Sequence, residues 1–220
     1  LPWLAGAAVA YAVARKGPFT SNVVEAGGFM RSGPAVASPD IQFVFMPAIK
    51  DFRRWIGRTH AFGLNTTLLQ PKSRGWLELA SPDPAAAPVL HPRFLEHEDD
   101  LARLVQGLRV ARQILSAPAF AAARGRELRP GSAVTSTAAL EAYVRDNLGT
   151  SFHPVGTCKM GPREDQAAVV DARLRVHGIA GLRVVDASIM PKVVSGNTNA
   201  PTMMIAERAA EFLREDARRA

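Results

Sequence analysis

Residues 151–161, Ser-Phe-His-Pro-Val-Gly-Thr-Cys-Lys-Met-Gly, place one histidine, His153, in a segment bounded by proline and glycine. A histidine side chain gains or loses a proton near neutral pH, and a rigid loop can hold it beside a reacting group. His153 is therefore a candidate general base. A purely structural role stays open, because an isolated histidine is a weak signal.

A second segment, Gly196-Asn-Thr-Asn-Ala-Pro-Thr202, precedes an apolar stretch. Asn197, Thr198 and Asn199 supply amide and hydroxyl groups, and Pro201 suits the first turn of a helix. A helix N-terminus carries free N–H groups and partial positive charge, which suits an anion forming on a bound ligand. The alternative is an ordinary N-cap, in which Asn or Thr bonds back to the helix amides.

A third segment, residues 182–188, reads Leu-Arg-Val-Val-Asp-Ala-Ser. Residues 182–185 are expected to form an apolar strand that ends in an acid. Asp186 and Ser188 at such a strand end can bind a polar ligand. A simple turn at the end of the strand is the alternative.

Cys158 is the only cysteine, so no disulfide forms within the chain, which fits a reducing compartment. One cysteine and one histidine do not make a zinc site, and no metal is expected. A cysteine nucleophile would need an orienting partner and an oxyanion hole. Cys158 is therefore expected to be a small packed residue.

The bulk composition fits a soluble globular protein of one or two domains, with 220 residues, 47% of them hydrophobic. The net charge is +7, but basic pairs such as Arg53-Arg54 are isolated, and no basic strip studded with aromatic residues is present. This argues against nucleic-acid binding. The apolar residues 1–14 are too short to span a bilayer and lack a signal-peptide n-region, so we expect a packed helix.

These segments must be positioned by a mixture of strands and helices. Strands are expected near Phe29 and at 41–46, 64–69 and 76–79, in an antiparallel arrangement with a turn at 70–75. The four prolines of residues 81–92 predict an extended connector. Helices are expected at 98–115, at 138–148 and from Pro201 onward, where the apolar first turn, residues 203–206, should be buried.

The motifs of residues 153–161, 181–191 and 196–207, in this order, resemble the C-terminal part of the glucose–methanol–choline (GMC) family of flavoprotein oxidoreductases. Asn-Thr-Asn-Ala-Pro at 197–201 is similar to the choline-dehydrogenase-like branch. Upstream segments at 17–22, 25–29, 39–43 and 70–75 also resemble that branch, so the likeness spans nearly the whole chain.

The resemblance implies an FAD-dependent enzyme that oxidises the CH–OH group of a primary alcohol, choline-like or other. His153 would remove the hydroxyl proton, Asn197 would bond the same oxygen, and hydride would pass to flavin N5. Asp186 and Ala187 would approach the ribityl and pyrophosphate of FAD, and Asn197, Thr198 and Asn199 would approach the isoalloxazine.

The resemblance further implies an α+β fold. Residues 1–150 would form part of the substrate-binding domain, with its antiparallel sheet, and residues 151–220 would complete an FAD-binding domain with a strand and a helix. The Gly-x-Gly-x-x-Gly turn of a Rossmann domain is missing from this sequence. The chain is thus expected to depend on a separate N-terminal FAD-binding part and to be inactive without it.

Other questions stay open at this stage. The chain could instead be a non-catalytic remnant or subunit that only packs against a nucleotide-binding partner. Apolar surface facing a missing part would favour self-association. A cytoplasmic location is expected, with peripheral association to the inner membrane as the alternative. Trp55 and Phe62 could line a substrate pocket or simply pack, and the electron acceptor, oxygen or quinone, is not specified.

Overall fold

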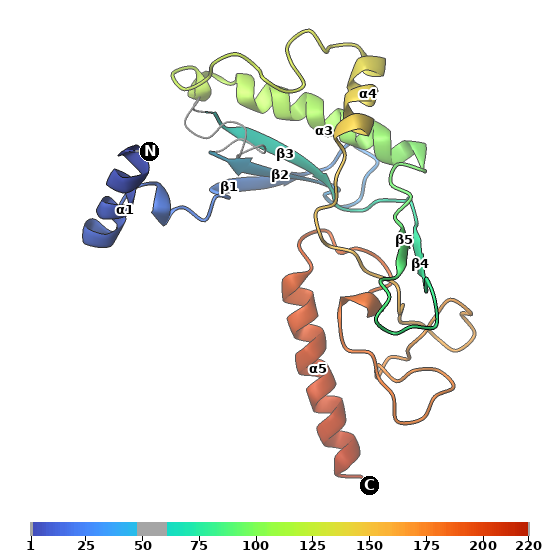
Figure 1. The fold of residues 1–220 in the computed structure, drawn as a ribbon. Helices are drawn as coiled ribbons and strands as arrows, with labels where there is room; N and C mark the ends of the chain where they lie inside the picture. Colours follow the sequence, from blue (N-terminus) through green and yellow to red (C-terminus); the bar gives the residue numbers. More distant parts are fainter. Residues whose placement is uncertain (1, 48–60, 220) are drawn as a thin grey trace. The chain divides into compact units, whose positions relative to one another are not determined.

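The computed structural model describes residues 2–47 and 61–219 (Figure 1). The chain forms two compact units, each made of two stretches: Leu1–Leu68 with Ala102–Asp146, and Leu69–Leu101 with Asn147–Ala220. The predicted division into a substrate-binding part, residues 1–150, and a C-terminal part, residues 151–220, is a functional one and stays a prediction. Arg53, Arg54 and Trp55 lie outside the described residues.

The first unit contains a three-stranded antiparallel sheet in the order β1-β2-β3. The strands are β1 (Ala26–Met30), β2 (Ile41–Met46) and β3 (Gly63–Leu68). Ile41 and Phe43 of β2 are buried, while the intervening Gln42 is half-buried. This alternation is the period of a strand with one face on a core, so the antiparallel sheet predicted for this region is confirmed.

Helix α3 (Glu98–Ser116) packs on this sheet, where Ala111 joins Ile41 and Phe43 in one buried cluster (Figure 1). The helix predicted at 98–115 is confirmed. Gly107 lets α3 approach closely, since a Cβ atom there would lie 2.5 Å from Cγ2 of Thr66. The 11-residue helix α4 (Thr137–Asn147) agrees with the one predicted at 138–148.

Phe62 belongs to a small aromatic cluster in the first unit. Its ring centroid lies 5.7 Å from that of Phe45 and 5.6 Å from that of Phe120. Of the two roles considered for Phe62, the structure shows packing.

Helix α1 (Pro2–Ala14) does form, but the expectation that it is packed is wrong. Among its described side chains only Ala7 is buried, and Val13 is 83% exposed. Its apolar residues point in all directions, so no single face favours one docking side. Among the described residues, no helix combines the length and apolar character needed to cross a bilayer.

The second unit holds a two-stranded antiparallel sheet of β4 (Trp76–Glu78) and β5 (Val89–His91). The prolines of residues 81–92 predicted only an extended connector, and that expectation is corrected here. The three residues between Pro88 and Pro92 each carry the backbone N–H that proline lacks. These residues pair with β4 in an antiparallel register.

The core of the second unit forms against one face of α5 (Asn199–Ala217). Ile205, Ala209 and Phe212 recur at helical spacing on that face and are buried with other apolar residues: Val170, Leu174, Ile189 and Met190. The expectation that the whole first turn of α5 is buried is wrong, because Met203 and Met204 are 57% and 59% exposed.

The strand predicted at 182–185 is also wrong. The structure gives this segment only an isolated bridge between Arg175 and Arg183. A strand needs a neighbouring strand to pair with its N–H and C=O groups. Within the described residues no ladder extends along this segment.

Candidate active site

The loop carrying His153 is fixed by backbone hydrogen bonds to the segment that follows residue 186. The N–H of Cys158 donates to the carbonyl of Ser188 at 3.1 Å, and the N–H of Met160 donates to Ile189 at 2.8 Å. Gly156 has φ of 91°, a conformation that glycine adopts without strain. These bonds attach the histidine loop to the core of the second unit, because Ile189 is buried there.

Asp186 precedes a short 3-10 helix, η3 (Ala187–Ile189), and caps it. Its Oδ1 accepts the N–H of Ser188 at 2.7 Å. Asp186 is exposed and Ala187 is half-buried. The structure therefore gives Asp186 the turn-forming role that was the alternative for this segment.

The first turn of α5 is held by Thr202, whose N–H and hydroxyl both donate to the carbonyl of Thr198, at 3.0 and 2.7 Å. Thr198 occupies the N-cap position but makes no side-chain bond to the helix amides. The ordinary side-chain N-cap considered for this segment is therefore not made by Thr198. Asn197 and Asn199, on either side of Thr198, are exposed.

His153 and the start of α5 meet directly. Nδ1 of His153 lies 3.0 Å from Oγ1 of Thr198, across 45 residues of sequence. His153 is half-buried and Thr198 is buried. The two motifs singled out in the sequence are thus brought together by the contact between His153 and Thr198. Thr198 was expected only near the cofactor, and its contact with His153 was missed because the N-cap pattern points to helix amides.

The other described histidines have partners that fit structural roles. Nε2 of His177 lies 3.1 Å from the carbonyl of Gly161, and Nε2 of His91 lies 2.9 Å from Oε1 of Glu78. His91 also stacks on Trp76, with ring centroids 4.7 Å apart. In residues 2–47 and 61–219, no group of three metal-binding side chains is present.

Hydrogen bonds and ion pairs of two aspartates fix the loops that follow the histidine loop in the chain. The hydrogen bond from Lys159, whose Nζ lies 2.6 Å from Oδ2 of Asp165, lowers the pKa of that carboxyl. Burial acts to raise the pKa of Asp171, but the backbone N–H groups of Arg175 and Arg173 outweigh it and lower the pKa. These bonds hold the two turns between the histidine loop and η3.

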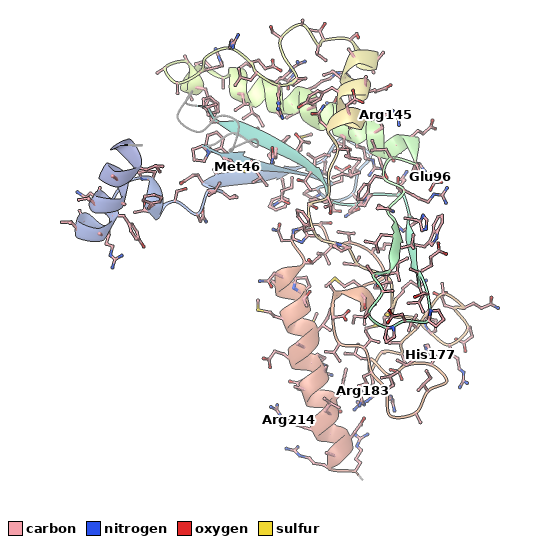
Figure 2. All side chains as sticks on the ribbon, viewed as in Figure 1. Met46, Glu96, Arg145, His177, Arg183 and Arg214 are labelled. Carbon is pink, nitrogen blue, oxygen red and sulfur yellow. The ribbon has the colours of Figure 1, made fainter. Side chains whose placement is uncertain are left out.

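The end of α5 is tied to the same region. Figure 2 shows Arg183 beside the C-terminal part of α5, where it donates to Asp216. Arg173 donates to the same carboxylate at 2.8 Å. The hydrogen bond from Arg183, with the charge of Arg173, lowers the pKa of Asp216. Both ends of α5 are therefore attached to the chain that carries the candidate site.

Comparisons with known proteins agree with the sequence motifs. A family model described as GMC oxidoreductase matches residues 71–206. The alcohol dehydrogenase (acceptor) of Pseudomonas putida is 46% identical over 204 residues, which make up 92% of this chain and 37% of that protein. The mitochondrial choline dehydrogenase of Mus musculus is 47% identical over 192 residues, covering 87% of this chain and 32% of that protein.

The fold is also that of a solved structure. A formate oxidase from Aspergillus oryzae RIB40 superposes with a TM-score of 0.85 at 24% sequence identity, over 97% of this chain and 42% of that one. The chain spans less than half the length of each of these proteins. Because the family model covers more than half of the chain, and the motifs at His153 and Asn197 lie within it, this chain belongs to the GMC oxidoreductase family.

Proposed function

We propose that the chain is the C-terminal part of an FAD-dependent oxidoreductase that acts on the CH–OH group of a primary alcohol. The observation that carries the proposal is the contact between His153 and Thr198, which holds an imidazole at the N-terminus of α5. Family membership and two relatives named as alcohol and choline dehydrogenases support the alcohol substrate.

The residues present fit a flavin. The first turn of α5 lacks a side-chain cap from Thr198, so its N–H groups suit an acceptor on a bound ligand. The Oγ atom of Ser188 is buried without a hydrogen-bond partner among the described residues, and Asp186 is exposed two residues earlier. Asp186, Ala187, Asn197, Thr198 and Asn199 would contact FAD. When bound, FAD supplies the oxidant that takes a hydride from the alcohol carbon.

The side chains of this chain handle the proton of the alcohol. His153 accepts the hydroxyl proton, which leaves the oxygen with the electrons needed to form a carbonyl group. Asn197 donates an amide hydrogen bond to the same oxygen and keeps it near the imidazole. Both roles require His153 to be held in place, which the loop bonds at Cys158 and Met160 support.

The proposal is tested in the complete enzyme by the rate of flavin reduction under an alcohol substrate. His153→Ala is expected to reduce that rate about 10²–10⁴-fold, the usual effect of losing a general base. His97→Gln is a matched control, because His97 is exposed and its Nδ1 accepts the N–H of Asp99 in its own turn. FAD content is measured in each variant by absorbance. A near-normal rate in His153→Ala would contradict the assignment.

A second candidate is a non-catalytic part that only packs against a nucleotide-binding partner. The exposed apolar side chains of Met203 and Met204 at the start of α5 favour it. Adding FAD to the isolated chain and measuring the flavin absorbance that survives gel filtration tests whether this part holds FAD by itself. We expect a colourless chain, inactive without the N-terminal FAD-binding part. Normal alcohol oxidation by a complete enzyme carrying His153→Ala would favour the second candidate.

A further inference from the structure

The hydroxyl of Thr198 contacts the ring of His153 and does not cap the helix. A threonine at an N-cap position normally accepts an N–H from the first turn. Thr198 makes no such bond, is only 8% exposed, and places Oγ1 3.0 Å from Nδ1 of His153. The buried hydroxyl therefore bonds the imidazole of His153 and not the amides of the helix.

The position of that hydroxyl is fixed from the helix side. The carbonyl of Thr198 accepts both the N–H and the hydroxyl of Thr202. A β-branched side chain has few χ1 rotamers available, so a fixed backbone also limits where its hydroxyl points. The orientation of the Thr198 hydroxyl is thus set by the helix, and the hydroxyl can in turn orient the ring of His153.

A threonine hydroxyl can donate or accept, so the proposed role of His153 as a base sets the direction of this hydrogen bond. In a neutral imidazole one nitrogen donates and the other accepts. His153 can take a proton at Nε2 only if its own hydrogen is on Nδ1, and that N–H must then donate to Oγ1 of Thr198. After proton uptake both nitrogens are donors, and the Nδ1–H bond to Thr198 remains as it was. The contact between Nδ1 and Oγ1 is therefore kept in both protonation states of His153, without movement of heavy atoms.

We propose that Thr198 is a positioning residue that keeps His153 in the Nδ1–H tautomer, so that Nε2 is the atom that takes the proton of the substrate hydroxyl. The bond made by one ring nitrogen sets the state of the other, as is general for histidine. This inference rests on the proposed function, because it assigns the atom at which the general base acts.

The test uses the complete enzyme with Thr198→Val, which removes the hydroxyl and keeps the branched shape, and Thr198→Ser, which keeps the hydroxyl. Thr137→Val is the matched control, since it removes an exposed threonine hydroxyl that accepts from Arg109 and lies outside both motifs. Three quantities are measured: FAD content, the rate constant of flavin reduction, and the His153 tautomer from long-range ¹H–¹⁵N spectra of ¹⁵N-histidine-labelled protein. The His153 signals are identified by their loss in His153→Asn.

We expect the Nδ1–H tautomer in the unaltered enzyme, in Thr198→Ser and in Thr137→Val. In Thr198→Val the Nε2–H tautomer should appear, and flavin reduction should slow about tenfold with FAD retained, the effect of one lost hydrogen bond. An Nε2–H tautomer in the unaltered enzyme would overturn the inference, even if Thr198→Val failed to fold. So would a normal tautomer and rate in Thr198→Val. If His153→Ala slows flavin reduction while Thr198→Val does not, only this inference fails, and the proposed function stands.

Discussion

The carboxylate of Asp100 binds Ser73 twice, with Oδ2 accepting the backbone N–H at 2.8 Å and the hydroxyl at 2.6 Å. Oδ1 of the same carboxylate accepts the N–H of Lys72 at 2.8 Å. Asp100 is 1% exposed and lies in the first turn of α3. The turn at 70–75 is therefore held by a buried acid that is distant in sequence.

Replacing Asp100 by Ala is expected to lower the free energy of unfolding by about 2–4 kcal/mol, since it leaves donors near a buried site without a charged acceptor. Urea unfolding followed by circular dichroism measures the change. Glu98→Ala is the control, because Glu98 is an exposed acid in the same turn of α3 and should cost about 0.5 kcal/mol or less. Equal losses in the two variants would show that the buried bonds to Ser73 contribute little.

At Gly107, replacement by alanine is expected to lower the stability of the fold, which is the opposite of its usual effect in a helix. In an exposed helix that change stabilises by up to about 1 kcal/mol. At Gly107 the new Cβ would lie 2.5 Å from Cγ2 of Thr66 and 3.2 Å from Cγ2 of Ile41. Gly107→Ala is therefore expected to destabilise by about 1–3 kcal/mol, the range for overpacking, as measured by thermal or urea unfolding.

The double variant Gly107→Ala with Thr66→Ala isolates that clash. Oγ1 of Thr66 is buried without a hydrogen-bond partner among the described residues, so Thr66→Ala alone should cost little. If the clash is the cause, the second substitution should recover most of the stability lost by the first, giving a clear coupling energy. Additive losses would point to another cause.

The elements that the sequence predicts well are those whose pattern is local. The alternation of Ile41 and Phe43 with Gln42 predicts a half-buried strand, and β2 is one. The apolar spacing along 98–115 predicts α3 to within a residue at its end. In both cases the side chains that face the core repeat at the period of the element itself.

The features that could not be predicted depend on partners distant in sequence. Residues 182–185 have the composition of a strand, but pairing depends on a neighbour that the segment itself does not encode. The exposure of Met203 depends in the same way on what packs beside α5. The contact between His153 and Thr198 joins residues 45 positions apart, and only the fold brings them together.

Asp186 allows its structural and cofactor-binding roles to be separated. Asp186→Ala removes the acceptor for the N–H of Ser188 and should cost about 1 kcal/mol of stability, as for a lost cap. Asp186→Ser keeps a capping oxygen and removes the negative charge. If Asp186 also contacts FAD, the complete enzyme carrying Asp186→Ser should be stable but retain less flavin after gel filtration. Full flavin retention in Asp186→Ser would restrict Asp186 to the cap.

The pairing of Asp216 with Arg183 and Arg173 makes the second unit sensitive to acid. The hydrogen bond from Arg183 lowers the pKa of Asp216 in the folded chain below its ordinary value of about 3.9. A carboxyl with a lowered folded-state pKa stabilises the fold above its ordinary pKa, and this contribution is lost as pH falls through the folded-state pKa. The free energy of unfolding should therefore fall as pH drops below about 4.

Asp216→Asn should flatten this pH dependence, because the amide cannot titrate, and only part of it should remain through Asp165 and Asp171, whose pKa values are also lowered. Urea unfolding at a series of pH values between about 2 and 7 measures the slope. An unchanged slope in Asp216→Asn would mean that the two arginines do not couple the protonation of Asp216 to folding. Attachment of the C-terminal part of α5 would then rest on the packing of its apolar face, Ile205, Ala209 and Phe212, and on the bond from Arg173 to Glu215.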